Sequence, residues 1–411
     1  MSKPKVSVVL AIYNHEKYVG KTIESVIGQT YQDWEFIIID DCSSDGSADV
    51  VRKYQDERIR FYPAKRNRGA VCTFNELLKK AQGEYIAFIG SDDIWHSGKL
   101  QEQVDFLEQN EKTAVCFTWA EFIDEEDRPY SSFQKECDCD IHIFMHENRT
   151  QGQCLRYFFD NDNYFCHPSA VIRSDVVREI GGFDPRFRQL HDYDYWMRVL
   201  QKYPVHIIQK TLVQYRRSSS ENASISASNL RNVIRVLNEH QTIIVAMIKA
   251  MDREIFCEAF QDLLRKEIRD EAQLICEKYF VLLRWQKLGV NNRQAAVRFL
   301  DDCVDGRVLD CLDQEYQYSL NDYYKETGEA WQLYPLDFYK DYQNLESINK
   351  NLENANRNLQ KSTEELQRVN KTQAREIGRL AREIQGMSRT LSWRITKPLR
   401  EVKKLGVKKG K

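Results

Sequence analysis

Two pairs of adjacent aspartates have residue types and spacing that could do chemistry. Asp40 and Asp41 follow the apolar run EFIII, and Asp92 and Asp93 follow the run YIAFI after a Gly-Ser step. Adjacent carboxylates repel one another, and a divalent cation or hydrogen bonds to a ligand would relieve that repulsion. An acidic pair after a strand could instead cap a helix, where aspartate is favoured. Two pairs in this context favour a shared ligand site.

The elements that would position these carboxylates alternate along the first 100 residues. Apolar runs predict strands, and apolar residues at helical spacing predict helices. The strands are expected over 6–11, 35–39, 59–62 and 85–89, and the helices over 18–29, 47–54 and 74–81. This alternation is typical of an α/β domain with a parallel sheet covered on both faces. Ligands bind such sheets beyond the carboxyl ends of the strands, so the residues after Ala11, Ile39 and Ile89 are candidates for the site.

Composition excludes several classes of protein. The chain has 411 residues, of which 42% are apolar and 30% charged, with a net charge of -2. These values predict two or three folded domains and no overall attraction to nucleic acid. No apolar run is long enough to span a membrane, and no signal peptide precedes the first strand, which favours a cytoplasmic protein. The eleven cysteines are then expected to be reduced.

One short stretch superficially resembles a metal cluster. It contains Cys137, Cys139, His142 and His146. A Cys-x-Cys step is not the usual zinc spacing, and the stretch is rich in acidic residues. A surface loop is the favoured interpretation.

The second half of the chain has a different pattern. From 229 to about 342, long helical stretches such as 233–251 and 254–283 predict an all-helical unit. Over 343–388 apolar residues then recur at alternating spacings of three and four, which predicts a coiled coil. Because a single helix cannot bury this stripe, self-association is favoured over an isolated exposed helix.

The C-terminal tail, 389–411, is strongly basic. It holds nine Lys or Arg residues and one Glu, and Leu391, Trp393, Ile395 and Leu399 interleave with the cations. This pattern suits a segment that lies at an anionic membrane surface, with apolar groups in the headgroup boundary. A solvated, disordered tail is the alternative.

Four strings carry a resemblance to a known family. SVVLAIYNHEKYVGKTIESVIGQTYQDWEFIIIDDCSSDGS, GEYIAFIGSDDIW, HPSAVIRSDVVREIGGFDPRF and HDYDYWMRV resemble the successive motifs of the family 2 glycosyltransferases, over about residues 4 to 220. The resemblance implies the GT-A fold, which has a Rossmann-like, mostly parallel sheet. It also implies a nucleotide-sugar donor, a divalent cation (Mn2+ or Mg2+) and inversion at the anomeric carbon.

The resemblance also implies roles for individual residues. Donor binding falls to Ala11, Tyr13, Asp41 and Asp92, with Tyr13 near the nucleobase, Asp41 accepting a hydrogen from the base and Asp92 contacting the ribose. Asp93 stands at the position of the metal ligand. Asp192 stands at the position of the base that activates the acceptor, and a helix N-cap is the alternative role for it.

The acceptor side is expected to include His167, Ser169 and His191, as contacts or as braces. His191 also departs from the family pattern, because the residue before the base is commonly Glu. Gly90 replaces an Asp that often precedes the acidic pair, and Ser218 stands where some members have His, which removes candidates for a third metal ligand. Phe74 replaces a frequent Arg, so Arg216 or a neighbour is expected to contact the donor phosphates.

Together these features predict four segments. They are a GT-A domain (1–225), an α-helical domain (226–342), a coiled coil (343–388) and a membrane-associating tail (389–411). The predicted function is metal-dependent, inverting glycosyl transfer to a lipid-linked or growing glycan of a bacterial surface polysaccharide, such as O-antigen or capsule, at the inner membrane. Homo-oligomers and no nucleic-acid partner are expected. A catalytically silent coiled-coil scaffold for polysaccharide assembly is the alternative.

Overall fold

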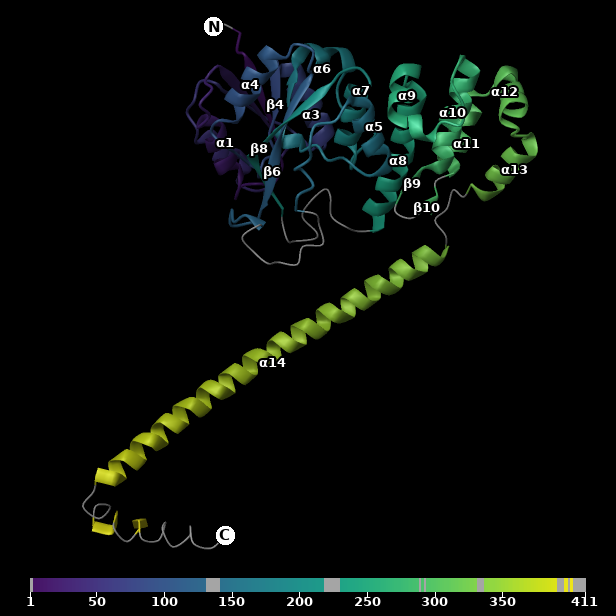
Figure 1. Cartoon of the computed structure of the whole chain (residues 1–411). Coiled ribbons are helices and arrows are strands. Elements are labelled where there is room, and N and C mark those ends of the chain that lie inside the picture. Colours follow the sequence, from purple (N-terminus) through teal and green to yellow (C-terminus); the bar gives the residue numbers. More distant parts are fainter. Residues whose placement is uncertain are drawn as a thin grey trace. The chain divides into compact units, whose positions relative to one another are not determined.

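The computed structural model describes residues 3–130, 141–217, 230–287, 290–291, 293–330, 336–389, 395–397 and 400–401 (Figure 1). The chain divides into two compact units, Met1–Trp331 and Gln332–Lys411. The first unit contains a sheet and the helices α1 to α13, and the second contains the long helix α14. Cys137, Cys139, Ser218 and most of the basic tail lie outside the described residues.

The described part of the first unit contains an eight-stranded sheet with the order β3-β2-β1-β4-β7-β6-β8-β5. Its strands are β1 Val6–Ile12, β2 Trp34–Asp40, β3 Ile59–Pro63, β4 Tyr85–Phe88, β5 Ile94–Trp95, β6 Val115–Ile123, β7 Val171–Arg173 and β8 Val205–Arg216. β1 pairs in parallel with β2 and β4, β2 pairs in parallel with β3, and β6 pairs in parallel with β8. Because β7 runs antiparallel to β4 and β6, and β5 to β8, the sheet is mixed but mostly parallel, as predicted.

Helices cover both faces of this sheet. They are α1 Val19–Ile27, α2 Ser47–Arg52, α3 Ala70–Lys80, α4 Lys99–Gln109, α5 Gln151–Asp160, α6 Ser174–Ile180 and α7 His191–Leu200. Side chains of α1, α2 and α4 share one core with Val8 of β1, whereas α3, α5, α6 and α7 share the other core with Val9. Successive residues of β1 therefore face opposite cores, which accounts for its continuous apolar sequence.

The predicted elements of the first 100 residues are present, with shifted ends. The largest shift is in α3, which begins at Ala70, four residues before the expected start. The helix begins directly after Gly69, whose φ of 85° is a conformation that glycine adopts readily.

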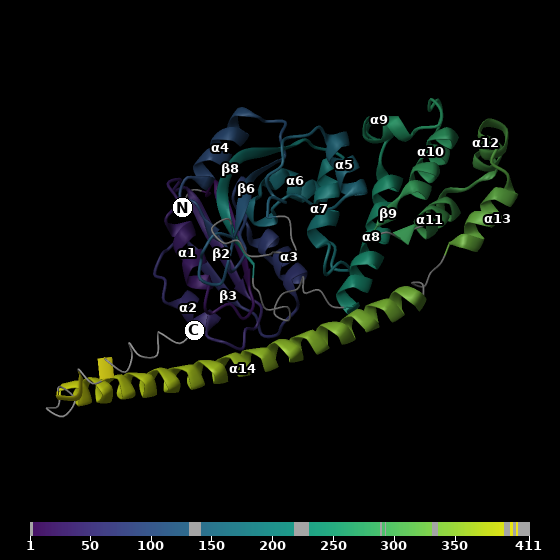
Figure 2. The ribbon, with the colours of Figure 1, turned by 60° about the horizontal axis from the view of Figure 1, so that its bottom comes forward.

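The region after the sheet is mainly helical (Figures 1 and 2). It contains α8 Leu230–Ala250, α9 Arg253–Phe260, α10 Glu271–Arg284, α11 Arg293–Cys303, α12 Gly306–Tyr316 and α13 Leu320–Glu329. A two-stranded hairpin, β9 Gln286–Lys287 and β10 Val290–Asn291, interrupts the helices.

The prediction of continuous helix over 254–283 is wrong, because the chain breaks between α9 and α10. The buried carboxylate of Glu277 accepts hydrogen bonds from the backbone N–H groups of Arg265 and Lys266, at 2.9 and 2.8 Å. Asp270 caps α10 by accepting from the N–H of Gln273 at 2.9 Å. These carboxylates satisfy the backbone of a loop that helical periodicity alone does not predict.

The second unit contains α14, Leu336–Arg389. Apolar side chains of the predicted coiled-coil stripe are exposed on it, including Leu352, Leu359, Leu366 and Ile377. Among the described helices of both units, none is long and apolar enough to cross a membrane.

Candidate active site

The sheet order brings the two aspartate pairs to one edge. β2 and β4 lie on either side of β1, so the loops after Asp40 and after Phe88 flank the carboxyl end of β1. The N–H of Asp41 donates to the carbonyl of Ile12 at 2.8 Å, which ties the first pair to the end of β1. This is the edge at which parallel sheets bind ligands.

The first pair is saturated with hydrogen bonds from the protein. Asp40 accepts from the N–H of Ser43 at 3.0 Å and from its hydroxyl. Asp41 accepts from the N–H groups of Arg68 and Gly69, at 2.9 and 2.8 Å, and is almost fully buried. Asp41 therefore holds the loop that leads into α3, in addition to the nucleobase role that the resemblance implies for it.

The second pair has fewer donors from the protein. Asp93 is 2% exposed, and its carboxylate accepts from the N–H of Arg216 at 2.9 Å. Burial raises the pKa of Asp93 well above its usual range, and the neighbouring Asp92 raises it further. Burial also raises the pKa of Asp92, against the opposing effects of His15 and Arg216. A repelling pair of which one carboxylate is buried favours a positive ligand.

Arg216 braces this pair and does not extend into solvent. Its guanidinium is 1% exposed and pairs with Asp127. The Nε atom donates to the backbone carbonyl of Asp92 at 2.9 Å, and Nη1 donates to the carbonyl of Asp124. The phosphate contact predicted for Arg216 would require it to leave these partners.

The glycine before the pair has a structural reason. A Cβ atom added to Gly90 would lie 2.3 Å from Oδ2 of Asp93, which is too close for any side chain. The Asp that other sequences carry at this position would therefore displace the Asp93 carboxylate. The observed position of the Asp93 carboxylate therefore depends on the absence of a side chain at residue 90.

A divalent cation fits this pair only as a site shared with the ligand. The described residues contain no group of three or more His, Cys, Asp or Glu side chains that could hold a metal. Mg2+ and similar ions are commonly bound by one or two carboxylates together with substrate phosphates. Buried Asp93 and the partly exposed Asp92 beside it fit that arrangement.

Asp192 lies in the first turn of α7, but it is not the helix cap. The N-cap is Leu190, so the alternative role as a cap does not hold. The carboxylate of Asp192 accepts from the side-chain amide of Asn163 at 2.9 Å and from the N–H of Tyr193 at 2.8 Å. Burial raises the pKa of Asp192, and His191 opposes this effect. Such a carboxyl is better suited to accept a proton near neutral pH than an exposed one.

A tyrosine of β8 connects the carboxylates electrostatically. Burial raises the pKa of Tyr215 well above its usual range, and the negative charges of Asp93, Asp92 and Asp192 raise it further. This direction agrees with the ring contacts that link β4 to the start of α7, where His167 lies 4.6 Å from Phe88 and 6.3 Å from His191, centroid to centroid. This observation supports a single site that includes the strand ends and the start of α7.

The residues predicted on the acceptor side differ in environment. Ser169 is fully buried, and its hydroxyl donates to the carbonyl of Cys166 at 2.8 Å and accepts from the N–H of Thr118 at 3.1 Å, so it braces the sheet. The two ring nitrogens of His167 are buried and have no hydrogen-bond partner among the described residues, and burial lowers the pKa of His167 to about 3. The ring of His191 lies 6.3 Å from that of His167, centroid to centroid.

His167 belongs to an aromatic cluster. Its ring centroid lies 4.6 Å from Phe88, 5.5 Å from Phe74 and 5.6 Å from both Phe183 and Trp196. Phe74, which replaces the frequent Arg, therefore contributes to the core beside the site and carries no charge to the donor.

The donor-side residues lie around the end of β1. Tyr13 is 47% exposed, as a residue that stacks on a ligand must be, and Ala11 is half-buried. Asn14, which follows Tyr13, has a φ of 55°, and its side-chain oxygen accepts from the N–H of Ser44 at 2.8 Å. His15 then contacts the Ser91 hydroxyl at 2.6 Å, which joins the β1 loop to the second aspartate pair.

Sequence reasoning missed Asn163 and His15 as partners of the carboxylates. Asn163 lies in the string DNDNYF, about thirty residues before Asp192, and no periodicity relates the two. His15 could have been found, because it stands in the loop directly after a predicted strand, where site residues are expected.

Comparisons with known proteins identify the family of the chain. Residues 7–181 match the family described as Glycosyl transferase family 2. An uncharacterized glycosyltransferase of Methanocaldococcus jannaschii is 31% identical over 227 residues, which are 54% of this chain and 74% of the relative. The putative teichuronic acid biosynthesis glycosyltransferase TuaG of Bacillus subtilis is 32% identical over 217 residues, 52% of this chain and 79% of TuaG.

The chain therefore belongs to glycosyltransferase family 2 and is a glycosyltransferase with a GT-A type of sheet domain. Among solved structures, residues 1–349 of S. aureus TarS in complex with UDP-GlcNAc align with a TM-score of 0.49 and 17% identity, covering 76% of this chain and 91% of that one.

Proposed function

We propose that the chain is an inverting, metal-dependent transferase that moves a sugar from a nucleotide-sugar donor to a glycan hydroxyl. The observation that carries the proposal is geometric: Asp92 and Asp93 follow the carboxyl end of β4, and His167 links that strand to the start of α7, because its ring centroid lies 4.6 Å from Phe88 and 6.3 Å from His191. A donor-binding pair and a separate, partly buried base in one site are what a single displacement requires. Retention through a covalent intermediate would need a carboxylate nucleophile on the donor face instead.

Asp192 takes the role of the general base. A sugar hydroxyl is a poor nucleophile at neutral pH, and a carboxylate within hydrogen-bond reach removes its proton as the new bond forms. Asn163 and the N–H of Tyr193 orient the Asp192 carboxylate for this transfer. After the reaction the proton rests on Asp192, and the bond between the sugar and the diphosphate is broken.

Asp93 and Asp92 hold the donor end. A divalent cation bound there would supply Lewis-acid stabilisation for the negative charge of the departing diphosphate. Oxygen ligands favour Mg2+ or Mn2+ over zinc. Arg216 keeps both carboxylates in place through its N–H bond to Asp93 and its Nε bond to the carbonyl of Asp92.

Thermal-shift screening of nucleotide sugars, with and without Mn2+, tests donor binding directly. A bound ligand stabilises the folded state by RT ln(1 + [L]/Kd), or about 2.7 kcal/mol at a hundredfold excess over Kd. One cognate donor should raise the melting temperature only with the metal present. A flat response to all donors with metal present would contradict the proposal.

The acceptor is proposed to be a lipid-linked or growing glycan of a bacterial surface polysaccharide, such as O-antigen or capsule. The similarity to TuaG, whose name is that of a putative teichuronic acid biosynthesis glycosyltransferase, supports this class. The basic tail would place the enzyme at the cytoplasmic face of the inner membrane through anionic lipid.

Self-association is proposed through α14. Its apolar stripe is exposed along the helix, with Leu359 and Leu366 each 63% exposed. A second copy would bury this stripe as a coiled coil and bring several active sites together at the membrane. The same stripe also favours the second candidate function, a catalytically silent scaffold, and replacing Asp192 separates the two because a scaffold does not need it.

A further inference from the structure

The base-bearing helix begins without a cap of its own. The N-cap of α7 is Leu190, which has no side-chain group to accept from the first backbone N–H groups. Helix starts leave such N–H groups unpaired unless another group accepts from them. The catalytic candidate Asp192 lies only two residues further on, so its position depends on how this start is held.

A carboxylate from the helical region holds the segment that leads into α7, up to its N-cap Leu190. Glu239 of α8 is 6% exposed, and its carboxylate accepts from three consecutive backbone N–H groups. The donors are Arg188 at 3.0 Å and Gln189 and Leu190 at 2.9 Å each. Bonds to a charged acceptor are stronger than those between neutral groups, so this contact fixes the segment that enters α7.

His240, the next residue of α8, contacts the segment that carries Asn163, whose side chain also holds the Asp192 carboxylate. The ring of His240 is fully buried, 4.8 Å from the Tyr193 ring, and its Nε2 lies 3.9 Å from Oδ2 of Asp162. Asp162 accepts from the N–H of Asn163, whose side chain donates to Asp192. Both segments that hold the Asp192 carboxylate therefore contact α8.

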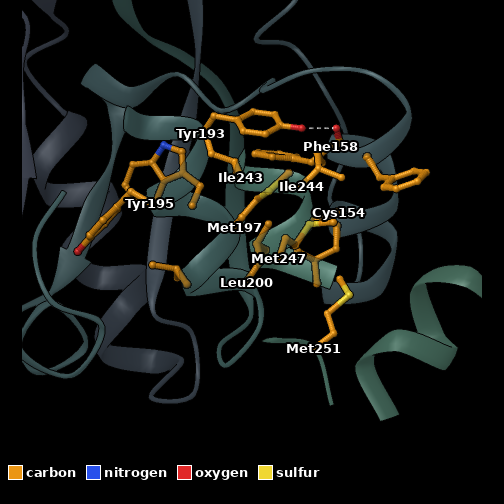
Figure 3. Close-up of a cluster of buried hydrophobic side chains, with 14 of the residues drawn as sticks. Cys154, Phe158, Tyr193, Tyr195, Met197, Leu200, Ile243, Ile244, Met247 and Met251 are labelled. Atoms are coloured by element: carbon orange, nitrogen blue, oxygen red, sulfur yellow. Dashed lines mark hydrogen bonds between the residues drawn. The ribbon is translucent and has the colours of Figure 1, made fainter. Parts of the chain in front are cut away.

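A close-packed core backs these polar contacts. Figure 3 shows Tyr193, Met197 and Leu200 of α7 near Ile243, Ile244 and Met247 of α8, and all six are buried. Such a core resists small displacements, so the two helices keep their register. A shift of Glu239 would consequently be transmitted to α7 and would not be absorbed between them.

We propose that Glu239 is a positioning residue for Asp192, and that the helical region beyond the family match completes the active site. The inference rests on the proposed function, because it needs Asp192 to be the base. It assigns a role to the helical region, for which the sequence analysis predicted a fold but no function. Glu239 touches no reacting atom and acts through residues 188–190.

The chain offers a matched control. Glu277 is also a buried glutamate on a helix that accepts from consecutive backbone N–H groups, those of Arg265 and Lys266. The loop it holds, between α9 and α10, does not lead into α7. Glu239→Gln and Glu277→Gln therefore remove the same kind of interaction from two places.

The experiment measures kcat, donor KM and the pH dependence of kcat for the full-length wild type and both variants. Glu239→Gln should lower kcat about 10- to 100-fold, because a small misplacement of a catalytic group is costly, with little change in donor KM. The acid limb of its pH profile should move to lower pH, since a loosened Asp192 is less desolvated. Glu277→Gln should lose stability but keep kcat and the pH profile.

Hydrogen exchange gives a readout that does not require catalysis. Amides 188–190 should exchange faster in Glu239→Gln only, and amides 265–266 faster in Glu277→Gln only. An equal loss of kcat in both variants, or a wild-type kcat and pH profile in Glu239→Gln, would overturn the inference while leaving the proposed function intact. A wild type without any transfer activity would overturn both, because there would be no base to position.

Discussion

The two aspartate pairs occupy equivalent places in the sheet but opposite environments. Loop residues donate hydrogen bonds to the first pair: Asp40 accepts from Ser43, through its N–H and hydroxyl groups, and Asp41 accepts from backbone N–H groups of the loop before α3. Asp93 is buried and Asp92 is partly exposed. Burial raises the pKa of both, Asp92 raises the pKa of Asp93 further, and Asp93 accepts from the backbone N–H of Arg216. The first pair is satisfied within the protein, whereas the second is incomplete without a ligand.

The difference shows that a carboxylate pair at a strand end does not define its own role. Donors in the surrounding loops decide whether the charge stabilises the protein or is available to a ligand. Stability and catalysis should therefore separate when the two pairs are mutated.

The largest effect is expected from Asp93→Asn. The asparagine can still accept from the N–H of Arg216, so the fold should be retained. Transfer should fall at least about 100-fold, because the charge that would hold a Lewis-acidic cation is lost. Metal-dependent activity assays check this, with thermal melting as the control for folding. Full activity with Mn2+ would place the metal elsewhere.

Asn163→Ala extends the comparison to the third carboxylate. Removing the 2.9 Å bond to Asp192 withdraws a donor that favours the charged form, so the pKa of Asp192 should rise further. The base must be deprotonated to act. As the pH is lowered, the activity of the variant should therefore begin to fall at a higher pH than that of the wild type. We expect a roughly 10-fold loss of kcat at neutral pH, within the range for general-base catalysis.

The pH profile of kcat checks this shift, with Asn161→Ala in the same loop as the control. An unchanged acid limb in Asn163→Ala would show that this amide does not tune the base.

Asp41→Ala should act first on stability. It removes the charged acceptor of the N–H groups of Arg68 and Gly69, and a hydrogen bond to a charged group contributes about 1.5–3 kcal/mol. Urea unfolding measures the loss. If Asp41→Ala lost donor binding without any loss of stability, the first pair would be a ligand site and not a structural one.

The smallest catalytic effect is expected in α14. Leu366→Asp places a charge in the exposed apolar stripe and should dissociate an oligomer, as measured by sedimentation. Gln367→Asp, off the stripe, is the control. Transfer to a soluble acceptor should be unchanged in both, since every carboxylate of the proposed site lies in the first unit. Loss of activity on dissociation would mean that the site needs a second copy.

Local signals in the sequence predicted much of the sheet domain. The continuous apolar runs correspond to β1, β2 and β4, and the acidic pairs lie at the edge where the loops converge, because parallel strands impose that arrangement. The break at residues 264–270 was not predictable in the same way. It depends on Glu277, whose contact with the loop is a tertiary one.

The sequence predicted the site residues that lie in recognisable motifs. It missed the residues that position them from distant parts of the chain. Asp192 could be singled out from the string HDYDYW, but Asn163 and Glu239 contact its surroundings from other elements. Sequence spacing also left a cap as an alternative for Asp192, and only the structure places Leu190 at that position.

The central claim is that Asp192 is the base of this reaction, and the pH dependence of single-turnover transfer tests it most directly. With donor, acceptor and metal saturating, the wild-type rate should fall in acid with an apparent pKa above the usual value of about 4 for aspartate, because burial raises the pKa of Asp192. Asp192→Asn should be slower by about 10²- to 10⁴-fold and should lack that limb. A variant that keeps both the rate and the acid limb of the wild type would contradict the account.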